Sequence, residues 1–570
     1  MGDAAEWAQR GAGRPRHRGP RLAWPRGELL GLERLPRGGP PMHMLRSTKW
    51  EWPPAGTRLS ISNTQEARDR PAGSSTPVAD SSMLRVARAV LAATALAFIV
   101  LPVYVSVRRI GYPFELEWME GGVLQHVERV LEGRMLYVPP SLEFTPFIYT
   151  PLYYFVSAPL VAIMGSSFLP MRLVSALAAV VVCVLIYRLV LRDARSRLAA
   201  FVAVGLFAAT FRHSGAWLDL ARVDSLFLAF LVGSVYLIRR YPSPRGAIAA
   251  GALLGLSFLT KQFAAVVAVP LLGWLVLTHI RRATAFAGGV LAIVGPVVTV
   301  FQVMSHGWFG YYAFELPPHH AWAHAELTRF WTADLLFALP IGILLAVTCC
   351  LLRDRGRSDP GFWVSFLLGM VGSSYLARLH SGGYDNVLLP AYAGIAVAAG
   401  LGLASIPAQK WWPNSLRGGV EVTTVLLVLV QFALLIYDPR SQVPSRSDLD
   451  AGRYVVERLR GAAGEIYVPF HGYLSAMAGR PPYAHAQAVA DVWKGGPGDR
   501  GRQILFPALA REFGRQRFSA VVIDEDWFKP DGFTDAYTPA ARVFDDPNSF
   551  RPVTGMPFRP EWIWLPKPRK

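Results

Sequence analysis

Charge is scarce in this chain of 570 residues. Only 17% of the residues are Asp, Glu, Lys or Arg, whereas 52% are hydrophobic. A soluble domain typically carries about 25% charged residues. The shortfall comes from long apolar runs, which a large soluble enzyme does not need. The composition therefore predicts a polytopic membrane protein.

Cysteine is nearly absent. The three cysteines, Cys183, Cys349 and Cys350, lie inside apolar segments, so neither a disulfide framework nor a metal-binding spacing is available. The segment PPHHAWAHAEL brings histidines together at helical spacing, but no clear third metal ligand accompanies them. We therefore predict no metal site and no cofactor.

The net charge is +18, which in other settings indicates nucleic acid as a partner. Here the basic residues lie in short clusters between apolar runs, which is typical of the cytoplasmic loops of membrane proteins. We therefore expect contact with membrane lipids and no nucleic-acid partner.

Three regions follow from the pattern of composition. Residues 1–82 are rich in Arg, Pro and Gly without periodicity, which predicts a disordered basic tail or a stretch upstream of a natural start at Met83. Residues 83–438 form the predicted transmembrane domain. Residues 439–570 mix strand-like runs (GEIYVPF, FSAVVID) with helix-like stretches, which predicts a soluble α/β domain.

Spans of about 20 mostly apolar residues cross a membrane. The candidate spans are 84–107, 170–191, 197–214, 222–239, 246–260, 262–280, 283–304, 333–352, 360–378, 386–407 and 419–437. Residues 149–165 are apolar but short, so they either span or lie in the interface. If they do not span, nearly all Arg and Lys clusters fall on one side, which the positive-inside rule makes cytoplasmic.

The resulting fold class is a polytopic α-helical protein of about eleven spans with a C-terminal extracytoplasmic α/β domain. Its predicted location is the bacterial plasma membrane, with the N-terminus cytoplasmic. The unusual polar residues then fall on the outer side, in several separate loops. Ionisable residues at membrane depth are costly and usually functional, so we expect these loops to form one site.

The first outer loop supplies two candidate catalytic carboxylates, Glu117 and Glu120, which share a face if they are helical. A carboxylate in an apolar site can act as a general base. The candidate substrate- or phosphate-binding residues are Lys261, Arg222, Asp224, Arg378, His380, Tyr384 and Asn386. Simpler roles remain open for them: an internal ion pair for Arg222, snorkelling for Lys261, and turn chemistry around Gly382–Gly383.

The order of these segments resembles a known superfamily. An acidic outer loop (EWMEGGVL) is followed by a Pro-Leu-Tyr-Tyr segment, then by MRLVSALAAVVVCVLIYRLV, ARVDSLFLAFLVGSVYLIRR and LGLSFLTKQ. This series resembles the GT-C membrane glycosyltransferases, especially bacterial relatives of the protein O-mannosyltransferases and aminoarabinose transferases (family 39-like). The resemblance covers residues 108–280 well and the rest of the membrane part loosely.

The resemblance implies a polyprenyl-phosphate sugar donor, an acceptor that is a lipid, glycan or protein, and inversion at the anomeric carbon. By position, Glu120 matches the Glu of the family's Asp-Glu pair, but Met119 occupies the Asp position, so Glu117 is the second candidate base. The family's Lys-Pro-Pro-Leu reads Tyr149-Thr150-Pro151-Leu152, so that lysine is absent and Lys261 of the Thr-Lys turn is expected to bind phosphate.

Two other classes of function remain. A transporter or lipid flippase predicts internal repeats and charges at mid-membrane, and no clear repeat is visible. A non-enzymatic envelope assembly protein, including a member that has lost activity, explains the C-terminal domain but not the acidic first loop.

Overall fold

The computed structural model describes residues 82–352, 360–524 and 529–569. The basic tail predicted over residues 1–82 lies outside these residues except for Ser82.

Six helices of the described chain are long and apolar enough to cross a membrane. They are α2 (Ser82–Arg109), α5 (Phe168–Ala194), α10 (Ile280–Met304), α14 (Pro360–Leu379), α15 with its preceding turn (Asp385–Ser405) and α16 (Asn414–Leu434). Four apolar helices are shorter: α4 (Leu152–Met164), α6 (Arg197–Ala209), α8 (Pro244–Thr260) and α9 (Ala264–Thr278). The chain is therefore an integral membrane protein, and the number of about eleven spans stays a prediction.

One predicted span is interrupted. The sequence suggested a single helix over 333–352, but the chain bends by 91° between Glu326–Leu336 and Pro340–Leu351. The first part combines α12 (Glu326–Arg329) with the π-helix η3 (Phe330–Leu336), and the second part is α13 (Pro340–Leu352). Pro340 lacks the N–H that would continue the earlier helix, so a new helix begins there.

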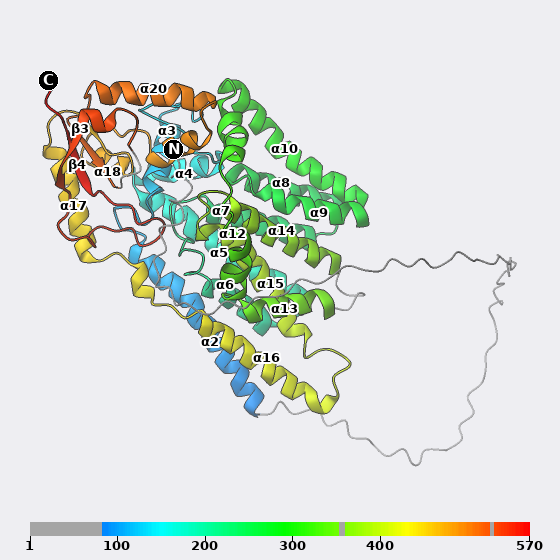
Figure 1. Cartoon of the computed structure of the whole chain (residues 1–570). Coiled ribbons are helices and arrows are strands. Elements are labelled where there is room, and N and C mark those ends of the chain that lie inside the picture. The colour runs from blue at the N-terminus through cyan, green and yellow to red at the C-terminus, as the bar shows by residue number, and fades with distance from the viewer. Residues whose placement is uncertain (1–81, 353–359, 525–528, 570) are drawn as a thin grey trace, which may run out of the picture. The chain divides into compact units, whose positions relative to one another are not determined.

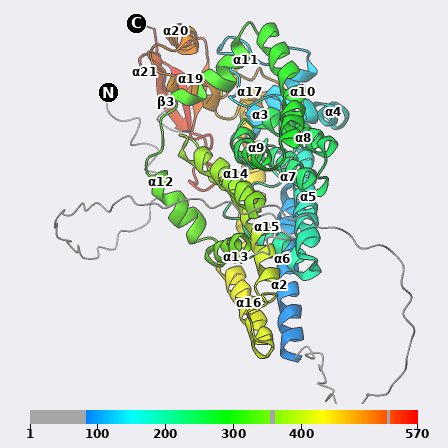
Figure 2. The same cartoon turned by 90° about the vertical axis from the view of Figure 1, so that its right-hand side faces the viewer.

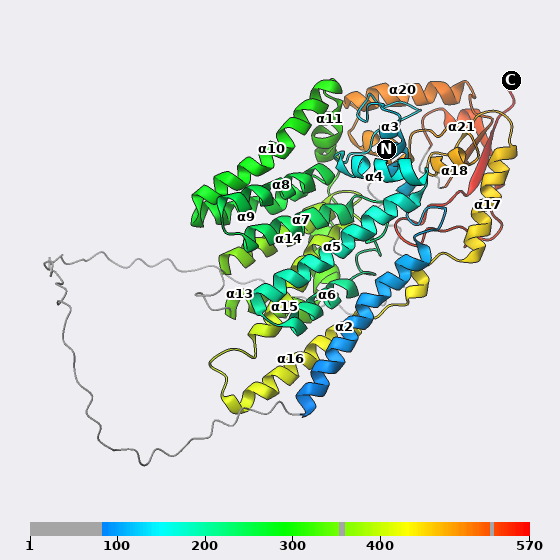
Figure 3. The same ribbon diagram turned by 180° about the vertical axis from the view of Figure 1, so that it is seen from behind.

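The apolar helices pack around α15 (Leu389–Ser405), which is the most buried of the long helices. It contacts α5, α6, α13 and α14, and Figure 2 shows it inside the bundle. Helix α7 (Asp224–Arg240) packs between α5 and α8, while α2 and α16 run side by side (Figure 3). The bundle thus brings the start of α7 close to the loop that follows α2, and the end of α8 close to the start of α7.

The loop after α2 leads into the amphipathic helix α3 (Glu120–Leu131), whose first turns are buried. Short elements fill the long segment after α10: α11 (Trp308–Gly310), η1 (Tyr311–Glu315) and η2 (Pro317–His319). A further 3-10 turn, η4 (Asp385–Leu388), precedes α15, and another, η5 (Pro439–Gln442), follows α16.

The C-terminal segment, residues 439–570, carries a four-stranded sheet of order β1-β2-β4-β3. Its strands are β1 (Ile466–Tyr467), β2 (Ala520–Ile523), β3 (Tyr537–Arg542) and β4 (Trp562–Pro566). Its helices are α17 (Arg446–Gly461), α18 (Gly472–Met477), α19 (Ala486–Lys494), α20 (Arg500–Gly514) and α21 (Phe533–Ala536).

Strands β1 and β2 are parallel, whereas β4 pairs antiparallel with both β2 and β3. The runs GEIYVPF and FSAVVID therefore contain β1 and β2. Helix α18 packs on α3, and Figure 1 shows the C-terminal segment at the end of the helices that carries α3. The segment thus contains both strands and helices, while the soluble α/β domain stays a prediction.

Candidate active site

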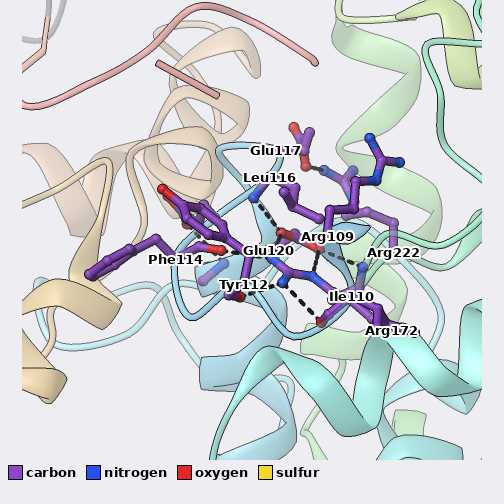
Figure 4. Close-up of polar contacts among 12 residues, drawn as sticks. Arg109, Ile110, Tyr112, Phe114, Leu116, Glu117, Glu120, Arg172 and Arg222 are labelled. Atoms are coloured by element: carbon purple, nitrogen blue, oxygen red, sulfur yellow. Dashed lines mark hydrogen bonds and ion pairs between the residues drawn. The ribbon is translucent and has the colours of Figure 1, made fainter. Parts of the chain in front are cut away.

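The loop between α2 and α3 is fixed by an arginine on α5. Arg172 is fully buried, and its guanidinium donates hydrogen bonds to backbone carbonyls of the loop (Figure 4). These acceptors are Ile110, Tyr112 and Phe114. The same guanidinium pairs with Glu120, with Nη2 2.6 Å from Oε2. The loop is therefore held at both ends by one side chain.

Glu120 has no free acceptor oxygen among the described residues. Oε1 accepts from Arg172 Nε at 3.0 Å and from the Ala221 N–H at 2.7 Å. Oε2 accepts from Arg172 Nη2 and from the Leu116 N–H at 2.7 Å. A carboxylate with all its lone pairs directed at protein donors is poorly placed to accept a substrate proton. This geometry favours a positioning role for Glu120.

Glu117 has different surroundings. Its Oε2 pairs with Arg222 and accepts from the Met119 N–H at 3.2 Å, and in the part of the chain that is described no donor reaches Oε1. Burial raises the pKa of Glu117 to about 7, against the opposing effect of the Arg222 charge. A buried carboxyl with one free oxygen and a pKa near neutrality is suited to take up a proton.

Arg222, just before α7, contacts both the Glu117 carboxylate and two aromatic side chains. Its Nη2 donates to the Tyr149 hydroxyl at 3.1 Å, and its guanidinium lies 5.4 Å from the Trp217 ring centroid. Its Nε is buried without a hydrogen-bond acceptor among the described residues. A buried donor without an acceptor costs free energy, and a bound anion would satisfy it.

A second ion pair adjoins the first. Lys261, at the end of α8, places its Nζ 2.6 Å from Asp224 Oδ1 at the start of α7. The Asn386 amide also donates to Asp224 Oδ1, at 3.0 Å, and the Trp217 indole donates to Oδ2 at 2.9 Å. Lys261 thus neither snorkels outward nor lacks an acidic partner, because α7 supplies one from a distant part of the sequence. A small cavity lies against Lys261, Asp224 and Asn386.

Arg378, at the end of α14, belongs to a separate acidic cluster. It contacts Asp334 at 2.8 Å, Asp385 at 3.2 Å and Glu326 at 3.2 Å. Its charge is therefore already matched by carboxylates, which fasten the bent segment before α13 to the turn after α14. This arrangement favours a structural role over phosphate binding.

His380 and Tyr384 lie in the same turn and also make protein contacts. His380 Nε2 lies 3.3 Å from the Pro317 carbonyl, and its ring centroid is 4.8 Å from that of His320. The Tyr384 ring lies 5.5 Å from Trp217, which also contacts Asp224 and Arg222. The structure therefore brings Tyr384 to the edge of the Glu117–Arg222–Asp224–Lys261 network and leaves His380 in the neighbouring cluster.

No group of three metal-ligating side chains occurs within residues 82–352, 360–524 and 529–569. The histidines of PPHHAWAHAEL do not converge on one point. His319 contacts the Glu315 carbonyl, and His320 contacts that of Asp491 at 3.1 Å.

Several residues of the site were not identified from the sequence. Arg172 lies inside an apolar helix, and the cost of burying an arginine there was a usable signal. Arg109 was also missed: it is buried and pairs with Asp219 at 2.5 Å. His471 and Asp524 follow the parallel strands β1 and β2, whose carboxyl ends meet at one edge of the sheet.

Part of the chain matches a known protein family, and its fold is similar to solved structures. Residues 148–303 match the family model of dolichyl-phosphate-mannose-protein mannosyltransferases. The crystal structure of ArnT from Cupriavidus metallidurans bound to undecaprenyl phosphate is similar, at 12% identity and a TM-score of 0.53, over 84% of this chain and 97% of that one. The apo form gives 13% identity and a TM-score of 0.52, over 85% and 98% of the two chains.

The apo oligosaccharyltransferase of Archaeoglobus fulgidus is more distant, at 12% identity and a TM-score of 0.48, over 75% of this chain and 69% of that one. No curated protein matches the sequence. The family model and the two ArnT structures confirm the resemblance stated from the sequence, and the two ArnT structures show that the chain shares their fold.

Proposed function

We propose that this chain, which has the fold of the GT-C membrane glycosyltransferases, transfers a sugar from a polyprenyl-phosphate carrier to an acceptor hydroxyl. Two similarities support this donor class. The matching family model describes an enzyme that uses dolichyl phosphate mannose, and the similar ArnT structure holds undecaprenyl phosphate. The acceptor is a lipid, a glycan or a protein outside the cytoplasm.

The observation that carries this proposal is the contrast between Glu117 and Glu120. Of these two carboxylates, Glu117 alone has an oxygen that no donor of the described chain reaches, and it lies in an ion-pair network with Arg222. Glu117 takes the proton from the acceptor hydroxyl, whose oxygen then attacks the anomeric carbon. The bond from that carbon to the phosphate oxygen breaks, and polyprenyl phosphate leaves with inversion of configuration.

Arg222 and Lys261 stabilise the charge that develops on the leaving phosphate. Arg222 offers a buried Nε that has no acceptor in the described residues, and Lys261 borders the cavity beside Asp224. Asp224 and Asn386 hold Lys261 in place. Glu120, Arg378, His380 and Tyr384 serve as supports that position the loops around this site.

The proposed topology places this site outside the cytoplasm. About eleven segments cross the membrane, with the short helices α6, α8 and α9 among them, and the N-terminus is cytoplasmic. Residues 83–438 form the membrane domain, and residues 439–570 form an extracytoplasmic domain beside the site.

The proposal is tested by sugar transfer. The purified full chain is incubated with radiolabelled polyprenyl-phosphate sugars and a membrane extract that supplies acceptors. We expect wild type to move label from carrier to acceptor, and Glu117→Gln to lower kcat by roughly 10²–10⁴-fold, the usual contribution of a general base. Lys261→Ala is expected to weaken binding of the carrier phosphate as well.

Donor binding serves as the control in the same experiment. Glu117→Gln should still be protected against thermal unfolding by undecaprenyl phosphate, because the phosphate contacts remain. If wild type transfers no sugar and no polyprenyl phosphate stabilises it, the transferase proposal fails.

A further inference from the structure

The C-terminal segment contacts the loop that carries Glu117 at every residue from 115 to 118. At residue 115 there are two contacts. The Glu115 N–H donates to the Tyr473 hydroxyl at 3.3 Å, and the Glu115 carboxylate lies 2.5 Å from the ring of His471. Both partners come from the region around α18. The loop is therefore held by the C-terminal segment immediately before the candidate base.

The next two residues are covered by a turn near the C-terminus. The Thr554 N–H donates a hydrogen bond to the Leu116 carbonyl at 3.3 Å, and the Thr554 hydroxyl donates one to the Gly215 carbonyl. Gly555 approaches Glu117 so closely that a Cβ at this position would lie 2.8 Å from Glu117 Cγ. Residues 554–555 thus lie directly against the candidate base.

Trp118 completes the series. Its ring packs against Phe470 and Phe558, with centroid distances of 6.0 and 4.4 Å. Its carbonyl accepts a hydrogen bond from His485 Nε2 at 3.1 Å, while His485 Nδ1 accepts from the Gln487 N–H. Burial lowers the pKa of His485 to about 3, so this ring is neutral and holds the tautomer that the two bonds require.

His471 forms the charged part of this interface. Its Nδ1 lies 2.5 Å from Glu115 Oε2, and its Nε2 lies 2.7 Å from Asp524 Oδ2. All three side chains are buried. Two ionised carboxylates only accept hydrogen bonds, so both ring nitrogens must donate, and the ring is an imidazolium.

Burial alone would disfavour the charged ring, but the carboxylates of Asp524 and Glu115 raise the pKa of His471 to about 10. Burial also raises the pKa of Glu115 to about 8 and raises that of Asp524, and the His471 charge opposes both shifts. The assignment of the imidazolium therefore rests on the geometry, in which each ring nitrogen faces a carboxylate oxygen. Other titratable groups lie near the cluster: Glu120 beside Glu115, His485 beside His471, and Arg559 and Glu561 beside Asp524. One imidazolium between two carboxylates makes each pairing costly to break once it is buried.

The carboxylate of Glu115 connects His471 to the chain on the far side of the candidate base. Its Oε2 binds His471, and its Oε1 accepts from the Gly121 N–H at 2.9 Å. Glu117 lies between these two attachments in the chain. Its distance from a bound acceptor therefore depends on where the C-terminal segment holds Glu115.

We infer that His471 is a positioning residue, through which the C-terminal segment sets the place of Glu117 and so completes the active site. This inference rests on the proposed function. It assigns to the C-terminal segment a task in catalysis that acceptor choice or simple capping would not require.

The first test is independent of activity. Hydrogen–deuterium exchange is measured on the full chain for peptides that cover residues 110–124, in wild type, His471→Gln and Asp524→Asn. We expect faster exchange in this loop in both variants, with exchange in the apolar helices unchanged. Asp450→Asn, an exposed substitution on α17, serves as the matched control and should leave the loop unchanged.

The second test separates position from binding. Both variants should lower kcat for sugar transfer at least about tenfold, since small displacements of a reacting group are costly, while KM for the donor stays within about twofold. Asp524→Asn preserves the side-chain shape, so it keeps the test valid if His471→Gln fails to fold. A general loss of structure would instead raise exchange throughout the helices.

The outcomes also separate this inference from the proposed function. If wild type transfers sugar, and both variants show wild-type kcat and wild-type exchange at 110–124, the inference fails and the transferase proposal stands. A lower kcat with unchanged loop exchange also overturns it. If wild type transfers nothing, the proposed function fails, while the exchange experiment still reports whether His471 holds the loop.

Discussion

At the scale of single residues, the protonation state of Glu117 determines how we expect kcat to depend on pH. Burial raises the pKa of this carboxyl to about 7. A general base acts only when it is deprotonated, so kcat should rise with pH up to about 7 and then level off. Below that pH we expect kcat to fall by about tenfold per unit. The measurement is a kcat–pH profile of wild type and Glu117→Gln, and an inflection that persists in the variant would assign the titration to another group.

Glu120 should respond differently to the same substitution. Glu120→Gln removes one charge of a fully buried ion pair and leaves Arg172 without its counter-charge. Breaking a buried pair from one side typically costs about 3–5 kcal/mol. We therefore expect a large fall in Tm. Glu457→Gln, which removes an exposed pair with Arg460 on α17, is the control and should change stability by less than about 1 kcal/mol. An unchanged Tm for Glu120→Gln would contradict the positioning role.

The sequence identified individual charged residues of the network better than their partners. Glu117, Arg222, Asp224 and Lys261 were found because charges at the edges of apolar runs are conspicuous. Their pairing was not predictable, since Lys261 and Asp224 are brought together only by the packing of α7 against α8. His471 was missed because nothing in its local sequence indicates the carboxylates that it meets. Arg172 was missed although an arginine inside an apolar helix is a usable signal.

At the scale of helices, glycines decide how closely two of them approach. Helices α8 and α10 cross where Gly251 and Gly289 face the partner backbone. A Cβ on Gly289 would lie 2.3 Å from the Ile248 carbonyl oxygen, whereas a Cβ on Gly288 meets nothing within 4 Å. Small residues at such crossings allow close packing in membranes.

These two neighbouring glycines form a matched pair for experiment. Gly289→Val should force the helices apart and lower stability by about 1–3 kcal/mol, the usual cost of overpacking. Gly288→Val is the same substitution at a position where the new side chain meets no neighbour, so it should have little effect. Thermal unfolding of both variants in detergent measures the difference, and equal Tm values would contradict the close crossing.

The lengths of the apolar runs predicted where helices begin and end, but they did not predict where a helix bends. The expected span 170–191 corresponds to α5 and 222–239 to α7, each within a few residues. The bend at Pro340 was missed because the flanking residues are apolar on both sides, so hydropathy continues through the break. The register of the sheet in the C-terminal segment also depends on pairing between distant residues, which composition does not reveal.

At the scale of the whole molecule, the two ends of the helices differ in how their arginines are placed. At one end lie the basic clusters of the loops, where Arg239 near the end of α7 pairs with Asp193 near the end of α5 at 2.7 Å. At the other end, Arg172 and Arg222 are buried and paired with carboxylates. Glu117 and Asp224 lie toward the other end, because α7 begins at Asp224. The positive-inside rule predicts that the end with Arg239 faces the cytoplasm. We therefore expect the proposed site and the C-terminal segment to face outward.

This orientation predicts which introduced cysteines a membrane-impermeant maleimide reaches in intact cells. Cys183, Cys349 and Cys350 are first replaced by serine to remove the background. Glu457→Cys, on the exposed side of α17, should then be labelled without lysis, because we propose that the segment containing α17 is extracytoplasmic. A cysteine at Arg417, near the start of α16, should be labelled only after the membrane is opened. The reverse pattern would place Glu117 and its loop in the cytoplasm, and it would make a donor presented on the outer face inaccessible to this site.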